Sequence, residues 1–253
     1  MTTELVYFAV TLVLTAAVAG ALTVVAWTDG HADDSLLGGR ARWGPLAGAA
    51  VGLAVVAVVL RVRAIAEADA LVVEKLAEAR APGLDDLFSL VTRMGDVVPT
   101  YTIASALAIA LMVSTHRLLT PWLLIAVVVV EIALQFLLAD HLFENVTIDV
   151  VEPMVPLGGA GSNPSGATAR LFTLFMVAAA ICRPDHQRVA RRLVVAGAVI
   201  TLVEVISRLY LGRHLVLDIF GGLFLGLILT LSTAAMVDAL APLERRLGGR
   251  VTW

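Results

Sequence analysis

Residues 191–238 read RRLVVAGAVITLVEVISRLYLGRHLVLDIFGGLFLGLILTLSTAAMVD. This stretch holds two long apolar runs on either side of a short polar turn. The runs cover about 191–209 and 215–238, and the turn carries arginine and histidine. A helix needs roughly 20 apolar residues to cross about 30 Å of hydrocarbon. The stretch therefore predicts two membrane-spanning helices with a charged turn at one membrane face.

The rest of the chain repeats this apolar pattern. Further runs of spanning length are found at about 4–27, 44–62, 97–114, 119–139 and 165–182. The chain has 253 residues, of which 59% are hydrophobic and 15% are charged, whereas a soluble domain carries roughly a quarter charged residues. We expect an all-α, polytopic membrane bundle of about six to seven transmembrane helices.

One segment, 63–93, has a different character. Acidic and basic side chains alternate there with Ala, Leu and Val at helical spacing, which is typical of an amphipathic helix at the membrane interface. The step Ala81-Pro82-Gly83 is expected to end that helix. No repeat or linker divides the chain, so we expect one membrane domain, 1–253, in which 1–62 supplies two N-terminal spans.

Composition excludes several classes of function. A formal net charge of −3 argues against a nucleic-acid binder, which would show a basic face. The single cysteine, Cys182, excludes an internal disulfide and a cysteine-rich metal site. His141 and Glu144 have a spacing that would allow a divalent metal, but no H-E-x-x-H pattern occurs and a solvated acidic loop is the simpler interpretation. We expect neither a metal nor another cofactor.

Basic residues predict the orientation in the membrane. With seven spans, one face receives Arg40, Arg42, Arg117, Arg183, Arg188, Arg191, Arg192, Arg245, Arg246 and Arg250. The positive-inside rule places that face in the cytoplasm. We therefore expect a multi-pass protein of the plasma (inner) membrane with a cytoplasmic C-terminus and with the 208–218 turn on the extracytoplasmic side.

The turn carries a pattern suited to phosphate chemistry. Ser207 to Asp218 reads S-R-x5-H-x3-D. His214 and Asp218 are four residues apart and share one face of a helix, so the carboxylate can hold one imidazole proton and leave the other nitrogen as a nucleophile. Arg208 matches phosphate oxygens with two parallel hydrogen bonds. The pattern indicates a phosphohistidine intermediate; the alternative is that Arg208, Arg213 and His214 only snorkel at the interface.

With this motif the sequence resembles the type-2 phosphatidic acid phosphatase family of membrane lipid phosphatases and the related haloperoxidases. The family's third motif, S-R-x5-H-x3-D, is complete at Ser207–Asp218, and its second, P-S-G-H, appears as Pro164-Ser165-Gly166-Ala167. The resemblance covers roughly residues 85–238.

The resemblance also implies roles for single residues. His214 would be the nucleophile and Asp218 its orienting partner. The residues that would bind the phosphate are Arg208, Ser165, Gly166 and Ser207. Ser165 and Gly166 open a helix, where backbone N–H groups are available to an anion.

Two departures from the family pattern concern turnover. Ala167 stands where the family has the histidine that protonates the leaving group, and loss of a general acid costs about 10²–10⁴-fold in rate. The first motif, K-x6-R-P, is absent: the register that keeps its proline puts Asn145 at the lysine and Glu152 at the arginine. Arg170, one turn after Ala167, either supplies the missing positive charge or snorkels to the interface.

Other carboxylates lie within the spans. Glu131, Gln135 and Glu204 are expected to form a buried polar seam, and Glu204 is placed to brace Arg208.

The leading hypothesis is a lipid phosphate or polyprenyl diphosphate phosphatase of the cell envelope, acting on a lipid substrate in the bilayer. The alternatives are a weakened family member that binds or transports a phospholipid, and a lipid phosphotransferase. The composition, rich in Ala, Val, Arg and Gly, is compatible with a GC-rich bacterial genome.

Overall fold

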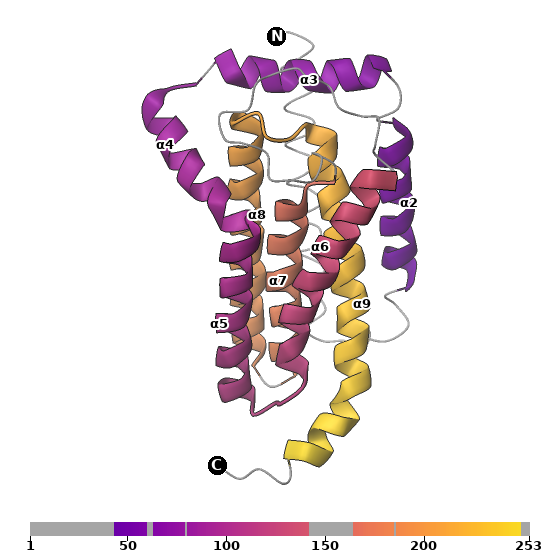
Figure 1. The fold of residues 1–253 in the computed structure, drawn as a ribbon. Coiled ribbons are helices and arrows are strands. Elements are labelled where there is room, and N and C mark those ends of the chain that lie inside the picture. Colours follow the sequence, from indigo (N-terminus) through magenta and orange to yellow (C-terminus); the bar gives the residue numbers. More distant parts are fainter. Residues whose placement is uncertain (1–42, 60–62, 79, 142–163, 185, 249–253) are drawn as a thin grey trace.

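The computed structural model describes residues 43–59, 63–78, 80–141, 164–184 and 186–248. Within these ranges the fold is all-helical, with eight α-helices and two short 3₁₀ helices (Figure 1). In chain order they are α2 (Trp43–Val59), α3 (Arg63–Glu78), α4 (Pro82–Val91), η3 (Thr92–Gly95), α5 (Val97–Thr115), η4 (Thr120–Trp122), α6 (Leu123–His141), α7 (Gly166–Cys182), α8 (Gln187–Tyr210) and α9 (Val216–Gly248).

Four helical stretches are long and apolar enough to cross a membrane: Val97–Thr115, Thr120–Ala139, Gln187–Tyr210 and Val216–Leu247. Two shorter apolar helices, α2 and α7, have 17 residues each. The chain is thus a multi-pass integral membrane protein, as its composition predicted. Of the expected spans, only the run at 4–27 lies outside the described residues.

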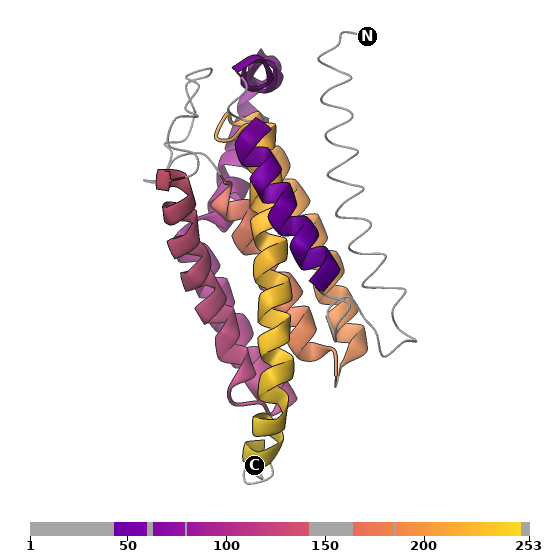
Figure 2. The same ribbon diagram turned by 90° about the vertical axis from the view of Figure 1, so that its right-hand side faces the viewer.

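α7 is the central helix of the bundle. It contacts α5, α6, α8 and α9, and these helices surround it in both views (Figures 1 and 2). Every residue from Gly166 to Cys182 is buried. Because α7 meets protein on all sides, an arginine on this helix needs protein partners rather than lipid or water.

The expected amphipathic segment 63–93 consists of two helices. α3 ends at Glu78 and α4 begins with Pro82 in its first turn, consistent with the expected break. α3 lies across one end of the bundle, and α4 descends from it toward α5 (Figure 1). Buried Asp69, Val72 and Val73 share one face of α3, because positions i, i+3 and i+4 lie together on a helix.

The end of the bundle below α3 is called the site end here; it consists of η3, the end of α8, the 211–215 turn and the starts of α7 and α9. These segments come from distant parts of the sequence and meet because α7 packs against both α8 and α9, and α7 and α9 start at the end where α8 finishes (Figure 1). The opposite end carries the connections from α5 to η4 and from α7 to α8.

Candidate active site

The turn after α8 brings the charged residues of the motif together. Gly212 adopts φ 70°, a left-handed conformation that favours glycine. The N–H of Arg213 donates to the carbonyl of Arg208 at 2.9 Å, and the N–H of Gly212 donates to Leu209 at 3.2 Å. These two bonds form a Schellman motif. The motif ends α8 sharply, so that Arg213 and His214 lie next to Arg208.

Arg208 is held by several acceptors and is 3% exposed. Its Nε donates to Glu204 Oε1 at 2.7 Å, and its Nη2 donates to the carbonyl of Thr92 at 3.0 Å. The expected brace by Glu204 is therefore confirmed. Because these bonds fix the guanidinium plane, the orientation of its Nη1 group is determined by the protein.

His214 has one nitrogen facing Arg208 and one facing Asp218. Nε2 lies 3.4 Å from Arg208 Nη1, and Nδ1 lies 3.5 Å from Asp218 Oδ2. Arginine can only donate, so Nε2 must carry the lone pair and Nδ1 the proton. The 3.5 Å contact orients the ring without forming a tight hydrogen bond. The arrangement directs an unprotonated Nε2 toward the position where Arg208 would hold a phosphate.

The surroundings of His214 favour the neutral imidazole. Burial lowers its pKa, and the nearby Arg208 and Arg213 lower it further, while the neighbouring Asp218 carboxylate opposes them. At neutral pH the nucleophilic form is thus the one present.

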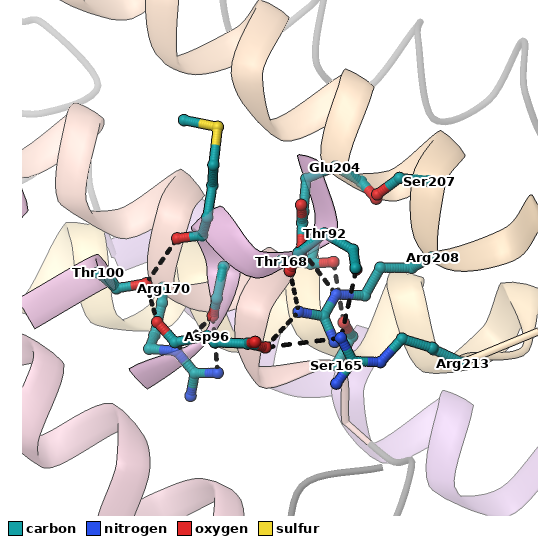
Figure 3. Close-up of polar contacts among 12 residues, drawn as sticks. Thr92, Asp96, Thr100, Ser165, Thr168, Arg170, Glu204, Ser207, Arg208 and Arg213 are labelled. Carbon is teal, nitrogen blue, oxygen red and sulfur yellow. Dashed lines mark hydrogen bonds and ion pairs between the residues drawn. The ribbon is translucent and has the colours of Figure 1, made fainter. Parts of the chain in front are cut away.

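A second guanidinium and a carboxylate complete the cluster (Figure 3). Asp96 Oδ1 lies 3.3 Å from Arg208 Nη2 and 3.6 Å from Arg213 Nη1. Arg213 also approaches Thr92 Oγ1 at 3.5 Å. Burial lowers the pKa of Arg213, with the positive charge of Arg208 as the next cause. Two buried cations in one cluster form a site that favours an anion.

The start of α7 lies beside this cluster. The Ser165 N–H donates to the carbonyl of Asp218 at 2.9 Å, and its hydroxyl is 2.9 Å from Thr168 Oγ1. Ser165 therefore ties α7 to α9, and its amide is engaged. The part of Ser165 and Gly166 in holding a phosphate stays a prediction.

Position 167 is closely packed by η3. A Cβ added to Gly95 would lie 2.5 Å from the Cβ of Ala167 and 2.5 Å from Glu204 Oε1. Only glycine fits at 95 with this spacing, and Ala167 is 1% exposed. The η3 backbone therefore packs closely beside position 167.

Arg170 reaches η3 from α7. Its Nη1 donates to Glu131 Oε2 at 2.9 Å and to Gln135 Oε1 at 3.1 Å, and its Nη2 donates to the carbonyl of Gly95 at 3.0 Å. The polar seam is thus formed by Glu131 and Gln135 around Arg170, while Glu204 pairs with Arg208. Arg170 fixes the position of η3; that it also binds substrate stays a prediction.

Ser207 faces the backbone of its own helix. Its hydroxyl donates to the carbonyl of Glu204 at 2.7 Å, and its side chain is fully buried. This contact supports the last turn of α8. A direct contact with phosphate stays a prediction for this residue.

Asp69 is a buried carboxylate that the motif did not include. It accepts the N–H groups of Val216 and Leu217, both at 2.9 Å, and so caps the start of α9 from α3. Burial raises the pKa of Asp69 to about 6, although these two hydrogen bonds lower it. The sequence holds one signal of this role: Asp69 shares the apolar face of its helix with Val72 and Val73.

Metal ligation finds no support in the part of the chain that the structure describes, since no group of three or more His, Cys, Asp or Glu there is placed to hold an ion. The acidic loop with Glu144, and the register that puts Asn145 and Glu152 at the first motif, fall in 142–163, outside the described residues.

Comparison with known proteins gives two similarities. The model of the PAP2 superfamily matches residues 142–241. The fold is similar to the crystal structure of the first transmembrane PAP2 type phosphatidylglycerolphosphate phosphatase from Bacillus subtilis, with a TM-score of 0.70 and 21% sequence identity over 78% of this chain and 97% of that one. No curated protein matches the sequence. At this identity the structural likeness supports the arrangement of the helices.

Proposed function

We propose that the chain is a member of the PAP2 superfamily, whose model matches residues 142–241, and that it hydrolyses the phosphate ester of a membrane lipid through a phosphohistidine at His214. The observation that carries the proposal is the contact of Nε2 with Arg208 at 3.4 Å. An unprotonated nitrogen beside a fixed guanidinium is the arrangement that attack on phosphorus requires.

The reaction would proceed in two displacements. In the first, His214 Nε2 attacks phosphorus, the bond to the lipid oxygen breaks, and the charge on the phosphoryl oxygens is stabilised by Arg208 and Arg213. Asp218 stabilises the positive charge that develops on the ring. In the second, water attacks the phosphohistidine and releases inorganic phosphate.

The lipid nature of the substrate is supported by the surface next to η3. The exposed residues of α4 include Leu84, Leu87 and Leu90, which are 45%, 51% and 67% exposed. A helix with such residues outward is suited to acyl or prenyl chains. Phosphatidic acid, phosphatidylglycerol phosphate and polyprenyl diphosphate all combine a chain of this kind with a terminal phosphate.

The proposed location is the plasma (inner) membrane of a bacterium, with the site end on the extracytoplasmic side and the C-terminus in the cytoplasm. The support is the distribution of arginine. The described arginines of the opposite end are Arg117, Arg183, Arg188, Arg191, Arg192, Arg245 and Arg246. Under the positive-inside rule this end faces the cytoplasm. We further propose that 1–253 forms one membrane domain whose catalytic part covers about 85–238.

A second candidate function is binding of a lipid phosphate without hydrolysis. Ala167 favours it, because alanine cannot protonate a leaving group. In that case Arg208 and Arg213 would hold the head group and His214 would remain unmodified.

One assay separates these functions. The purified protein in detergent is incubated with phosphatidic acid, phosphatidylglycerol phosphate and a polyprenyl diphosphate, and released phosphate is measured beside the variant His214→Asn. Release by the natural protein and none by the variant supports hydrolysis. Lipid binding without release would establish the binding function, and release of the alcohol without free phosphate, dependent on an added acceptor, would establish transfer.

A further inference from the structure

The cluster around Arg208 contains a nucleophile, yet the family position for the proton donor holds Ala167. An alkoxide is a poor leaving group, so hydrolysis of a lipid phosphate needs a group that gives a proton to the departing oxygen. The following inference rests on the proposed phosphatase function and concerns the identity of that group.

Packing shows that the donor is not to be sought at position 167. The η3 backbone packs close to the Ala167 methyl group, since a Cβ added to Gly95 would lie 2.5 Å from the Ala167 Cβ and also 2.5 Å from Glu204 Oε1. Alanine at 167 has no proton to give. The segment packed beside it, η3, continues directly into Asp96.

The carboxylates around the site differ in their exposure to water, and three of them, Asp218, Glu204 and Asp69, are buried. Asp218 Oδ2 accepts the N–H of Leu215 at 2.9 Å and faces His214. Glu204 is 1% exposed and bonded to Arg208, and Asp69 is 1% exposed and caps α9.

Asp96 is the exception, because its side chain is 42% exposed. Exposure allows this carboxyl to exchange protons with water during each turnover. Its backbone is fixed, since its carbonyl accepts both the N–H and the hydroxyl of Thr100, at 3.0 Å and 2.8 Å. The chain therefore presents a half-exposed carboxyl on a fixed backbone.

The guanidinium of Arg208 places Asp96 and His214 on two flanks of a bound phosphate. His214 Nε2 lies by Nη1 at 3.4 Å, whereas Asp96 Oδ1 lies by Nη2 at 3.3 Å. A phosphate held by both Nη groups would have the nucleophile on one side and the carboxyl on the other. In-line displacement needs this relation between the attacking nitrogen and the leaving oxygen.

We propose that Asp96 is the general acid of the reaction and takes the part of the missing motif histidine. In the first step His214 forms the N–P bond, the P–O bond to the lipid breaks, and the Asp96 carboxyl proton passes to the lipid oxygen. In the second step the Asp96 carboxylate takes a proton from water, the water oxygen bonds to phosphorus, and the N–P bond breaks. The sum is lipid phosphate plus water giving lipid alcohol plus phosphate.

Substrate binding itself prepares Asp96 for this role. In the structure its carboxylate contacts the guanidinium groups of Arg208 and Arg213 (Figure 3). A phosphate that binds these two groups replaces the carboxylate as their partner. The Asp96 carboxyl, released from both ion pairs, then lies beside the bound phosphate.

The test compares leaving groups that do and do not need a proton. Two substrates with the same alkyl chain are used, an alkyl phosphate and a nitrophenyl phosphate that carries the chain on its ring. Asp96→Asn is expected to slow the alkyl phosphate about 10²–10⁴-fold and the nitrophenyl phosphate less than about tenfold. The matched control is Asp86→Asn, an exposed carboxylate on α4, which is expected to leave both rates within about twofold.

The outcomes distinguish this inference from the proposed function. Equal losses on both substrates, or no loss on either, would overturn the role of Asp96 while phosphatase activity that depends on His214 stands. If the natural protein hydrolyses neither substrate, the proposed function fails and the inference falls with it. Folding of Asp96→Asn is checked by its thermal shift with inorganic phosphate. If the variant does not fold, a series of leaving groups on the natural protein decides: a weak dependence on their acidity supports an acid catalyst, and a steep one contradicts it.

Discussion

At each end of the bundle a carboxylate from another helix accepts backbone N–H groups at a helix start. At the opposite end Glu244 of α9 accepts the N–H groups of Leu118, Leu119 and Thr120 at 3.0, 2.7 and 2.6 Å. At the site end Asp69 of α3 accepts those of Val216 and Leu217. In each case a distant carboxylate satisfies the free amides at a helix start.

The two ends differ in the exposure of their arginine side chains. Arg188, Arg191 and Arg246 at the opposite end are exposed, whereas Arg208 and Arg213 at the site end are 3% and 5% exposed. Exposed arginines keep their hydration, so their charges cost little free energy. Buried ones beside a neutral histidine cost desolvation free energy, which an anionic substrate offsets. The comparison indicates that the capping carboxylates, Asp69 and Glu244, both have a structural role. The buried charges that the proposed reaction needs lie at the site end.

The largest effect is expected from a substitution of His214 at the site end, with His116 at the opposite end as its control. His214→Asn removes the nucleophile and is expected to lower phosphate release by at least about 10³-fold. His116 lies exposed at the opposite end with φ 53°, a conformation that asparagine accepts. His116→Asn should therefore leave the rate unchanged. Comparable losses in both variants would show that the two ends are not distinct in function.

The next effect concerns the shape of the buried cation. Arg208→Lys keeps the charge beside Glu204 but loses the fork that reaches Thr92 and the phosphate. The loss of two charge-assisted hydrogen bonds, each worth about 1.5–3 kcal/mol, is expected to lower kcat/KM by roughly 10²-fold or more. Arg246→Lys at the opposite end should not change it. Titration with inorganic phosphate checks that weaker binding is the cause.

The two capping carboxylates give a smaller and more selective effect. Asp69→Ala and Glu244→Ala are each expected to lower the free energy of unfolding by about 0.5–2 kcal/mol, the usual worth of a cap. Only Asp69→Ala should also lower kcat, by several-fold, since it releases the start of the helix that carries Asp218 beside His214. Thermal unfolding in detergent and turnover per folded molecule measure the two quantities. A fall in kcat for Glu244→Ala would contradict the separation of the ends.

The smallest effect is a shift in pH dependence. Because burial and two cations lower the pKa of His214 from its ordinary value of 6.5, the neutral nucleophile persists as pH falls to 6.5, and kcat/KM should drop only below it. Arg213→Gln removes one of these cations and is expected to move the acid limb upward by a fraction of a pH unit. A limb that stays in place would show that Arg213 does not act on His214.

The sequence was sufficient for the features that depend on local spacing. Apolar run length predicted the described spans, and the four-residue spacing of Glu204 and Arg208 predicted their ion pair, because these patterns need no knowledge of the tertiary fold. The Ser207–Asp218 motif likewise predicted that Arg208, His214 and Asp218 lie together at the turn.

Features that join distant segments were not predictable in this way. Asp96 meets Arg208 across 112 residues, and Asp69 meets Val216 across 147 residues. A carboxylate before a span or within an amphipathic helix is usually solvated, so nothing local identified Asp96, and the position of Asp69 on the apolar face of its helix did not indicate its partner. Their partners follow from how α3 and η3 dock on the bundle.

The central claim is that His214 becomes phosphorylated during turnover. The most direct measurement is to mix the protein with a lipid phosphate labelled with ³²P, quench within the first turnovers, and locate the label by mass spectrometry. We expect acid-labile, alkali-stable label on His214 that is lost on chase with unlabelled lipid and is absent from His214→Asn. Hydrolysis without label on His214, or label on another residue, would contradict the account.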